Sequence, residues 1–555
     1  MLTLHRLPTA RGLRPLALRL LLWGLLLSVA LPAQAVDARI TPGSVQDTLE
    51  SPRLTPPSTP AQVVMPVQPQ PSPHDPRARR FKVHAFNMSG NTVFSASTLK
   101  RVLERFLDME LNLYDLNVAA ETITAFYQER GYPLARAVIP PQRVVDGAVT
   151  VRIVEGRIGK VTVSGNRRHG TQFMTARTAS LAPGTLVTGN TLERSMLLLN
   201  DIPGLSARVV LQPGEDFGTT DAEIRVNEKL VSGNFTLTNH GRKETGLYKA
   251  EAALNVNSPL GLGDQFAFSG SSTQNQLVRY WKLGYSAPLN ANGTRITIGA
   301  SRAEYEVSGV LAALGVTGEV RSANLSISHP WERTRRTSQW FNVDIKRSRL
   351  TQNALGVPIS DHAINVLTLS YLVNHIHADT STTTASLSLA TNLKHPKTPA
   401  QQDALFARME ADVTHITPFI KEWDLYLRGN MVYSREMLPD TEKFSLGGPA
   451  SVRAFRPSEV RGDSGYVGTA ELRHPFALAG RMGIFRLTAD LGEVVYKAPG
   501  FRNTSDQLRS VGFGASFYPF SGTSLSFDYA HEIGSSDASN DGKRSRFWVN
   551  FSAYF

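Results

Sequence analysis

The chain has 555 residues, no cysteine and a formal net charge of +12, so it can form several domains and does not depend on disulfides. Four of the positive charges lie in the first 35 residues, which carry no acidic residue, and the remaining +8 is too mild a bias to indicate nucleic-acid binding. Beyond the N-terminal run, no apolar segment approaches the roughly 20 residues of a spanning helix. A membrane form would therefore have to be a closed β-barrel.

Residues 1–35 have the pattern of a secretory signal peptide. Four arginines precede a leucine-rich run from Leu20 to Leu31, and Ala33-Gln34-Ala35 supplies a small-residue cleavage site. A membrane anchor is the weaker interpretation, because the apolar run is too short and a cleavage site follows it. We predict export and cleavage after Ala35.

Residues 36–80 form a predicted linker with one short element inside. Eight prolines between positions 56 and 76 indicate an extended tract that packs poorly. Ahead of it, Pro42–Glu50 could start a helix with Ser44 as its N-cap and Asp47 three residues on. Such a helix is marginal alone, and could be a detachable plug or a frayed terminus. The residues alone favour the frayed terminus.

An internal repeat of about 75 residues follows. Ser89-Gly90-Asn91 recurs as Ser164-Gly165-Asn166, and Val151–Glu155 has its counterpart in Ile224–Glu228. The spacing predicts two domains of one kind, at residues 81–156 and 157–229, each with the element order β-α-α-β-β.

The long helix of the first unit shows apolar residues at helical spacing, with Asp115 as the predicted N-cap. Each predicted three-stranded sheet leaves an edge on which an extended chain can add a strand. The units could therefore capture a peptide, or act only as rigid spacers.

From about residue 230 to the end, apolar and polar residues alternate in segments of roughly ten, as in Tyr248–Asn257, Trp423–Tyr433 and Phe547–Phe555. A soluble β-sandwich would also alternate. The signal peptide, the aromatic C-terminal strand and more than 300 unbroken residues of β pattern favour an outer-membrane barrel. At about 20 residues per strand and connection, residues 230–555 predict an antiparallel transmembrane barrel of about 16 strands.

Residues 444–466 interrupt this pattern. The stretch holds Gly447, Gly448, Val452, Arg453 and Phe455, and a loop this long between strands is usually functional or disordered. A barrel of about 16 strands has a wide lumen. We therefore expect a loop that folds inward and packs against the wall.

An arginine inside the lumen needs a carboxylate partner. Alternation along Phe485–Leu491 turns Asp490 inward, just before Gly492. Glu471 lies between two lipid-facing residues and is a second lumen carboxylate. We predict an Arg453–Asp490 pair, with Glu471 as the second candidate.

These residues resemble the TpsB transporters of two-partner secretion, the FhaC/ShlB group of the BamA superfamily. The family signature corresponds to Leu446-Gly447-Gly448, Val452-Arg453-Ala454-Phe455 and Asp490-Leu491-Gly492. Further similarity covers nearly the whole mature chain, in Tyr127–Gln142 and Leu192–Gly204, which resemble the two POTRA domains of the family, and in Asn239–Gly246, which resembles the start of its barrel. The chain departs from the pattern at Ala454, where the family has glycine, and at Thr488, where it often has an aromatic residue.

The resemblance implies a transporter in the outer membrane of a Gram-negative bacterium, with periplasmic POTRA domains. It would recognise a large exoprotein, TpsA, by its N-terminal secretion domain and secrete it in extended form through the barrel without ATP. Ser44, Val45 and Leu49 would belong to a plug helix. Other implied partners are membrane lipid and the barrel assembly machinery, which would recognise the C-terminal strand ending at Phe555.

Two other function classes stay open: a BamA-like insertase that assembles outer-membrane proteins, and a barrel enzyme. Gly462-Asp463-Ser464-Gly465 is similar to the nucleophile turn of serine proteases, but no matching histidine or aspartate context precedes it, and a solvated turn is favoured. We expect no enzyme activity, no cofactor, no metal and no nucleic-acid partner. Two repeats and a tethered helix favour the transporter over the insertase.

Overall fold

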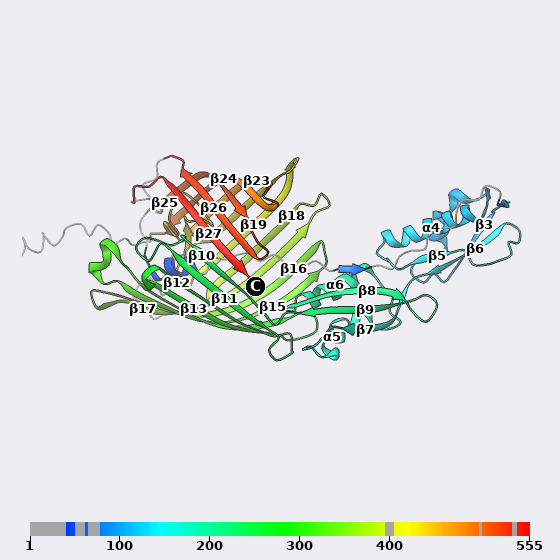
Figure 1. Ribbon diagram of the computed structural model, residues 1–555, viewed down its shortest axis with the longest axis horizontal. Coiled ribbons are helices and arrows are strands. Elements are labelled where there is room, and N and C mark those ends of the chain that lie inside the picture. The colour runs from blue at the N-terminus through cyan, green and yellow to red at the C-terminus, as the bar shows by residue number, and fades with distance from the viewer. Residues whose placement is uncertain (1–39, 50–61, 65–77, 394–404, 499–501, 535–540) are drawn as a thin grey trace, which may run out of the picture.

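The computed structural model describes residues 40–49, 62–64, 78–393, 405–498, 502–534 and 541–555. Figure 1 shows a β-barrel followed along the long axis of the molecule by two smaller α/β units. The predicted signal peptide and most of the predicted linker lie outside the described residues. Among the helices of the described residues, none is long and apolar enough to cross a membrane.

The first α/β unit is built around the sheet β3-β6-β5, in which β3 and β6 run parallel. Its elements are β2 (Phe81–Lys82), β3 (Ala85–Ser89), α3 (Ala96–Val102), η1 (Glu104–Phe106), β4 (Glu110–Leu111), α4 (Leu113–Glu129), β5 (Arg136–Val138) and β6 (Ala148–Val154). The apolar face of α4, including Leu116 and Ile123, packs into the core of this unit. The predicted N-cap is wrong by three residues, because Asn112 caps α4 and Asp115 bonds back to the Asn112 N–H.

The second α/β unit repeats this plan but has four strands, in the order β1-β8-β9-β7. Its own elements are β7 (Arg157–Ser164), α5 (Thr171–Arg177), η2 (Ala179–Leu181), α6 (Gly189–Asn200), β8 (Leu205–Pro213) and β9 (Thr219–Glu228). The fourth strand, β1 (Gln62–Val64), comes from the proline-rich linker and pairs in parallel with β8 at Arg208–Val210. The expectation of an open edge is therefore wrong at β8, where the chain's own linker adds the strand (Figure 1).

The repeated Ser-Gly-Asn motif has a structural cause. A side chain on Gly90 would collide with the carbonyl oxygen of Ile153, and one on Gly165 would collide with that of Val226, so both glycines allow a loop to cross the sheet closely. The repeated glutamate closes the same loop. Glu155 accepts the N–H groups of Thr92 and Val93, and Glu228 accepts those of residues 167–169.

The barrel closes with sixteen antiparallel strands, which confirms the predicted fold class. Its first strand, β10, pairs with β11 and with the last strand, β27. The strands are β10 (Val231–Thr238), β11 (Lys249–Asn257), β12 (Gln265–Thr273), β13 (Val278–Pro288), β14 (Arg295–Glu306), β15 (Thr317–Arg333), β16 (Thr337–Ala354), β17 (Val357–Ile376), β18 (Thr382–Asn392), β19 (Ala407–Ile420), β20 (Trp423–Ser434), β23 (Ser464–Leu478), β24 (Arg481–Tyr496), β25 (Thr504–Phe517), β26 (Thr523–Glu532) and β27 (Ser545–Tyr554). Short η3 (Gln274–Gln276), η4 (Gly309–Leu314) and η5 (Asp440–Glu442) lie in the connections.

The second α/β unit is joined to one end of the barrel by buried polar contacts. Arg333, at the end of β15, donates to both carboxylate oxygens of Asp201, which follows α6 in the second α/β unit. Buried His169 lies between Glu228 at 2.8 Å and Ser258 of the barrel at 2.7 Å. These contacts fix the orientation of the second α/β unit relative to the barrel.

Candidate functional site in the barrel lumen

The connection between β20 and β23 folds into the lumen. Its two arms pair as the antiparallel strands β21 (Phe444–Leu446) and β22 (Val460–Gly462). The turn between them carries the predicted motif. The predicted inward loop, residues 444–466, ends too late, because Ser464–Tyr466 already belong to barrel strand β23.

The tip of this loop is a compact turn. Gly447 and Gly448 have φ of 102° and 98°, a region that favours glycine, and the Gly448 N–H donates to the carbonyl oxygen of Phe455 at 3.1 Å. Val452 and Phe455 are fully buried in an apolar cluster inside the barrel. Ala454 is buried too and does not have a positive φ, so its backbone conformation is one that alanine adopts readily.

Arg453 joins the loop tip to the barrel wall. Its backbone N–H and its Nη1 each donate to Asp490 at 3.2 Å, and its Nη2 donates to Glu471. Asp490 also accepts hydrogen bonds from Thr469 at 3.1 Å and from Ser510 at 2.9 Å. The structure thus brings Arg453 to both nominated carboxylates, which lie on the neighbouring strands β24 and β23.

Two further contacts hold the same loop. The indole Nε1 of Trp548 on β27 donates to the carbonyl oxygen of Arg453 at 2.8 Å. Gly492 leaves the space into which Leu446 of β21 packs, because a Cβ at this position would lie 2.9 Å from the Leu446 side chain. The spacing of Asp490 and Gly492 therefore has a double purpose: a charge partner for the tip and a gap for the arm.

A second ionic group lies beyond the tip. Arg456 donates to Glu459 through Nε at 2.8 Å and through Nη2 at 2.7 Å, and its Nη1 lies 3.1 Å from Glu244 in the β10–β11 connection. Arg242 of the same connection donates to the carbonyl oxygens of Pro457 and Ser458. The loop therefore contacts both sides of the junction at which β10 closes the barrel against β27: Trp548 on β27, and Arg242 and Glu244 after β10.

Helix α2 (Pro42–Leu49) lies inside the lumen (Figure 1). From the sequence, this helix could be either a plug or a frayed terminus. Ser44 and Val45 are buried, and Leu49 packs partly buried against the inner wall. The helix begins two residues earlier than the predicted cap. Thr41 and Ser44 exchange hydrogen bonds between side chain and backbone, so Ser44 is the third residue of the helix and not its N-cap.

Helix α2 is held mainly by Asp440 and Arg461. Asp440 accepts hydrogen bonds from the Thr41 hydroxyl at 2.9 Å and from the Gly43 N–H at 2.6 Å. Arg461, on strand β22 of the inward loop, pairs with Asp440 and with Asp47 of the helix, the latter at 3.0 Å. Helix and loop therefore share one ionic group.

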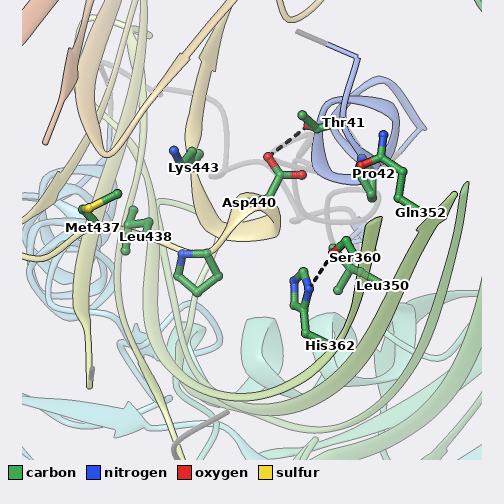
Figure 2. Close-up of a pocket in the computed structure, with 11 residues that line it drawn as sticks. Thr41, Pro42, Leu350, Gln352, Ser360, His362, Met437, Leu438, Asp440 and Lys443 are labelled. Carbon is green, nitrogen blue, oxygen red and sulfur yellow. Dashed lines mark hydrogen bonds between the residues drawn. The ribbon is translucent and has the colours of Figure 1, made fainter. Parts of the chain in front are cut away.

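A cavity of about 290 Å³ lies beside this contact. It is lined by Thr41 and Pro42 at the start of the helix, by residues of β16 and β17, and by Met437 and Asp440 of the connection after β20 (Figure 2). A larger cavity of about 1200 Å³ continues along the lumen and is lined by charged and hydroxyl side chains. Helix and loop narrow the lumen without filling it.

Sequence reasoning missed Asp440, Arg461 and Trp548 as members of this site. The Asp463–Ser464 turn is buried, so the predicted solvated turn is wrong. Its role is structural, because Asp463 accepts the N–H groups of Leu438 and Lys497, and the Ser464 hydroxyl bonds to the Ser434 backbone. Within the part of the chain that the structure describes, no three histidine, aspartate or glutamate side chains are grouped to hold a metal ion.

Residues 218–517 match the family model described as haemolysin secretion/activation protein ShlB/FhaC/HecB, and residues 81–156 match the POTRA domain of ShlB type. The chain belongs to this family. The first match covers the inward loop and most of the barrel, and the second covers the first α/β unit. The family consists of TpsB-type outer-membrane transporters, and the predicted resemblance is thus confirmed.

Similar proteins include the heme/hemopexin transporter protein HuxB of Haemophilus influenzae, 24% identical over 81% of this chain and 83% of HuxB. The outer membrane transporter CdiB of Escherichia coli is 23% identical over 69% of this chain and 67% of CdiB. Among solved structures, CdiB from Escherichia coli superposes with a TM-score of 0.68 at 19% identity, covering 97% of this chain and 98% of CdiB. BamA from Haemophilus ducreyi lacking POTRA domains 1–3 gives 0.53 at 15% identity, covering 86% of this chain and all of that one. These likenesses show the same fold.

Proposed function

We propose that this TpsB protein recognises one large exoprotein in the periplasm and passes it in extended form through the barrel to the cell surface. In this proposal residues 81–156 and 157–229 are periplasmic POTRA domains, and residues 230–555 are the outer-membrane pore. The observation that carries the proposal is the lumen itself. It is polar, and it is narrowed by an N-terminal helix and by a loop fixed to the wall.

Recognition would use strand addition. The β8 edge of the second POTRA domain accepts an extended strand, since β1 of the linker already occupies it over three residues. So short a parallel pairing is weak compared with a longer strand that the exoprotein could supply. Displacement of β1 would also free the tether that joins the POTRA domains to helix α2.

Transport would need no ATP. The periplasm holds no nucleotide pool, and folding of the exoprotein outside the cell would make its passage directional. The loop tip at Arg453 would stay on the wall as part of the pore lining, while α2 would leave. Ser44, Val45 and Leu49 are the plug residues of this proposal, and Gly447, Gly448, Val452, Arg453 and Phe455 are its loop residues.

The test is deletion of the gene and return of either the wild-type chain or an R453Q variant. A large, repetitive exoprotein encoded beside this gene should disappear from the medium on deletion, return with the wild-type chain, and return in a smaller amount with R453Q. Unchanged secretion of that exoprotein would refute the proposal. The insertase alternative predicts a different result, namely a general fall in folded outer-membrane barrels.

A further inference from the structure

An arginine-rich patch lies on the outside of the barrel. It consists of Arg279 on β13, Arg302 on β14, Arg321 on β15, and Arg347 and Arg349 on β16. Each has the same parity along its strand as exposed apolar residues of the outer wall, such as Ile298, Leu325 and Ile345. The side chains of Arg321 and Arg349 are 61% and 63% exposed. The patch therefore faces the membrane and not the lumen.

Strand register places three of these arginines directly side by side. Arg302 is the cross-strand partner of Arg321, and Arg321 is the partner of Arg349. Like charges directly opposite each other on a sheet are destabilising. Such a row needs negative charge close by.

Carboxylates of the chain supply only part of that charge. Glu319 pairs with Arg302 and Arg321, Glu304 lies 2.9 Å from Arg279, and Asp361 lies 2.9 Å from Arg349. Arg347 has no ion pair among the described residues. With Glu306, which is exposed on the same face of β14, five arginines face four carboxylates, which leaves an excess of one positive charge and the Arg347 guanidinium available as a donor.

The depth of the patch fits a lipid head group. The turn at Arg335 lies at the barrel end that carries the POTRA domains, where its N–H donates to Glu193. Arg321 and Arg349 each lie about 14 residues along their strands from that turn, which is roughly 35 Å of height for a tilted strand. The apolar band of such a barrel is only about 25 Å tall. Trp281, the cross-strand partner of Arg302, continues the row on β13 and is exposed, as interfacial aromatic residues are.

We propose that the patch formed by Arg279, Arg302, Arg321, Arg347 and Arg349 binds the phosphate groups of an outer-leaflet lipid. Arginine is suited to this because its planar fork of donors matches two phosphate oxygens, and basic clusters at head-group depth recognise phosphorylated lipids. The carboxylates hold the guanidinium groups in place, while the excess charge and the outward donors are left for the lipid. The inference uses the membrane orientation proposed above, with POTRA domains in the periplasm, and adds a lipid partner to it.

The test uses the purified full-length chain in detergent, with lipid A, which carries two phosphates, as the probe. Binding is followed by native mass spectrometry and by the fluorescence change of Trp281, judged against a W281F variant. The double variant R321Q/R349Q should bind lipid A at least about tenfold more weakly, because it loses two charged donors. The single variant R347Q removes an arginine that has no ion pair, so it leaves no carboxylate without its partner. It should bind lipid A several-fold more weakly than the wild type. It also keeps the test decisive if the double variant fails to fold.

The matched control is R509Q. Arg509 is also an outward, exposed arginine, but it lies on β25 opposite Leu491 and has no arginine across the sheet. R509Q should bind lipid A as the wild type does, and inorganic phosphate or phosphatidylethanolamine at equal concentration should produce no comparable signal. Equal lipid A binding by wild type, R347Q and R321Q/R349Q, equal weakening by R509Q, or equal binding of free phosphate would each overturn the proposal. No exoprotein is needed, so this result is independent of the secretion assay.

Discussion

We expect the substitution G43A, which adds one methyl group to helix α2, to displace the helix from the lumen. A Cβ on Gly43 would lie 2.5 Å from Asp440 Oδ2 and 2.6 Å from Arg461 Nη2, and it would also collide with the Asp440 carbonyl oxygen. The Asp440 side chain can turn aside, but its backbone cannot. Overpacking of this kind costs about 1–3 kcal/mol, so G43A should raise the unplugged fraction by about 5-fold to 150-fold.

Planar lipid bilayers with the purified protein measure this directly, because an unplugged barrel conducts ions. G43A should show more frequent or longer openings at unchanged unit conductance. The control is G429A, the same substitution in barrel strand β20, where a Cβ would meet nothing within 4 Å. If G43A, correctly folded, conducts as rarely as the wild type, α2 is not the element that closes the lumen.

Three other outcomes are expected. R453Q leaves buried Asp490 without its arginine at a cost of about 3–5 kcal/mol, while Glu471 keeps Arg473. It should lower secretion more than D490N does, and reversal of the charges at positions 453 and 490 should restore secretion; failure of the swap would count against the pair. V63C/V209C joins register partners of β1 and β8 in a chain without cysteine, so oxidation should block secretion and reduction should restore it, with each single variant as the control. Burial alone would raise the pKa of Glu155, but hydrogen bonds from Thr92, Val93 and Tyr127 outweigh it and lower the pKa. The stability that this carboxylate contributes is therefore lost as pH falls through the lowered pKa, and acid unfolding of E155Q, followed by circular dichroism, should depend less on pH in that range.

The sequence alone predicted which carboxylates of the barrel wall belong to this site, because successive side chains of a strand point to opposite faces of the sheet. Once the outward residues of β24 were assigned by their apolar character, Asp490 had to face the lumen, and the same argument applied to Glu471 on β23. An arginine on an inward loop then had few possible partners. The repeat at Ser89 and Ser164 likewise predicted two similar units, because its glycines and glutamates serve the same local loop in each.

Contacts between distant segments could not be predicted in this way. Asp440 and Arg461 meet α2 across about 400 residues of chain, and no periodicity relates the two segments. The pairing of β1 with β8 involves only three residues of the linker, which are too few to show the alternation that predicts a strand. Caps were misplaced for a local reason: Asn112 and Thr41 each share the cap with a polar residue three positions on, and the sequence pattern pointed to that second residue.

The two elements in the lumen are held with very different strength, and this orders the steps of opening. When α2 leaves, Arg461 loses Asp47 but keeps Asp440, so no buried charge is left alone. When the loop tip leaves, Arg453 loses two buried carboxylates and the Trp548 hydrogen bond together, and Leu446 leaves its gap at Gly492. Breaking a buried ion pair on one side costs about 3–5 kcal/mol, whereas departure of α2 leaves buried Arg461 with its Asp440 partner. Helix α2 should therefore move first, on a barrel wall that still carries its loop.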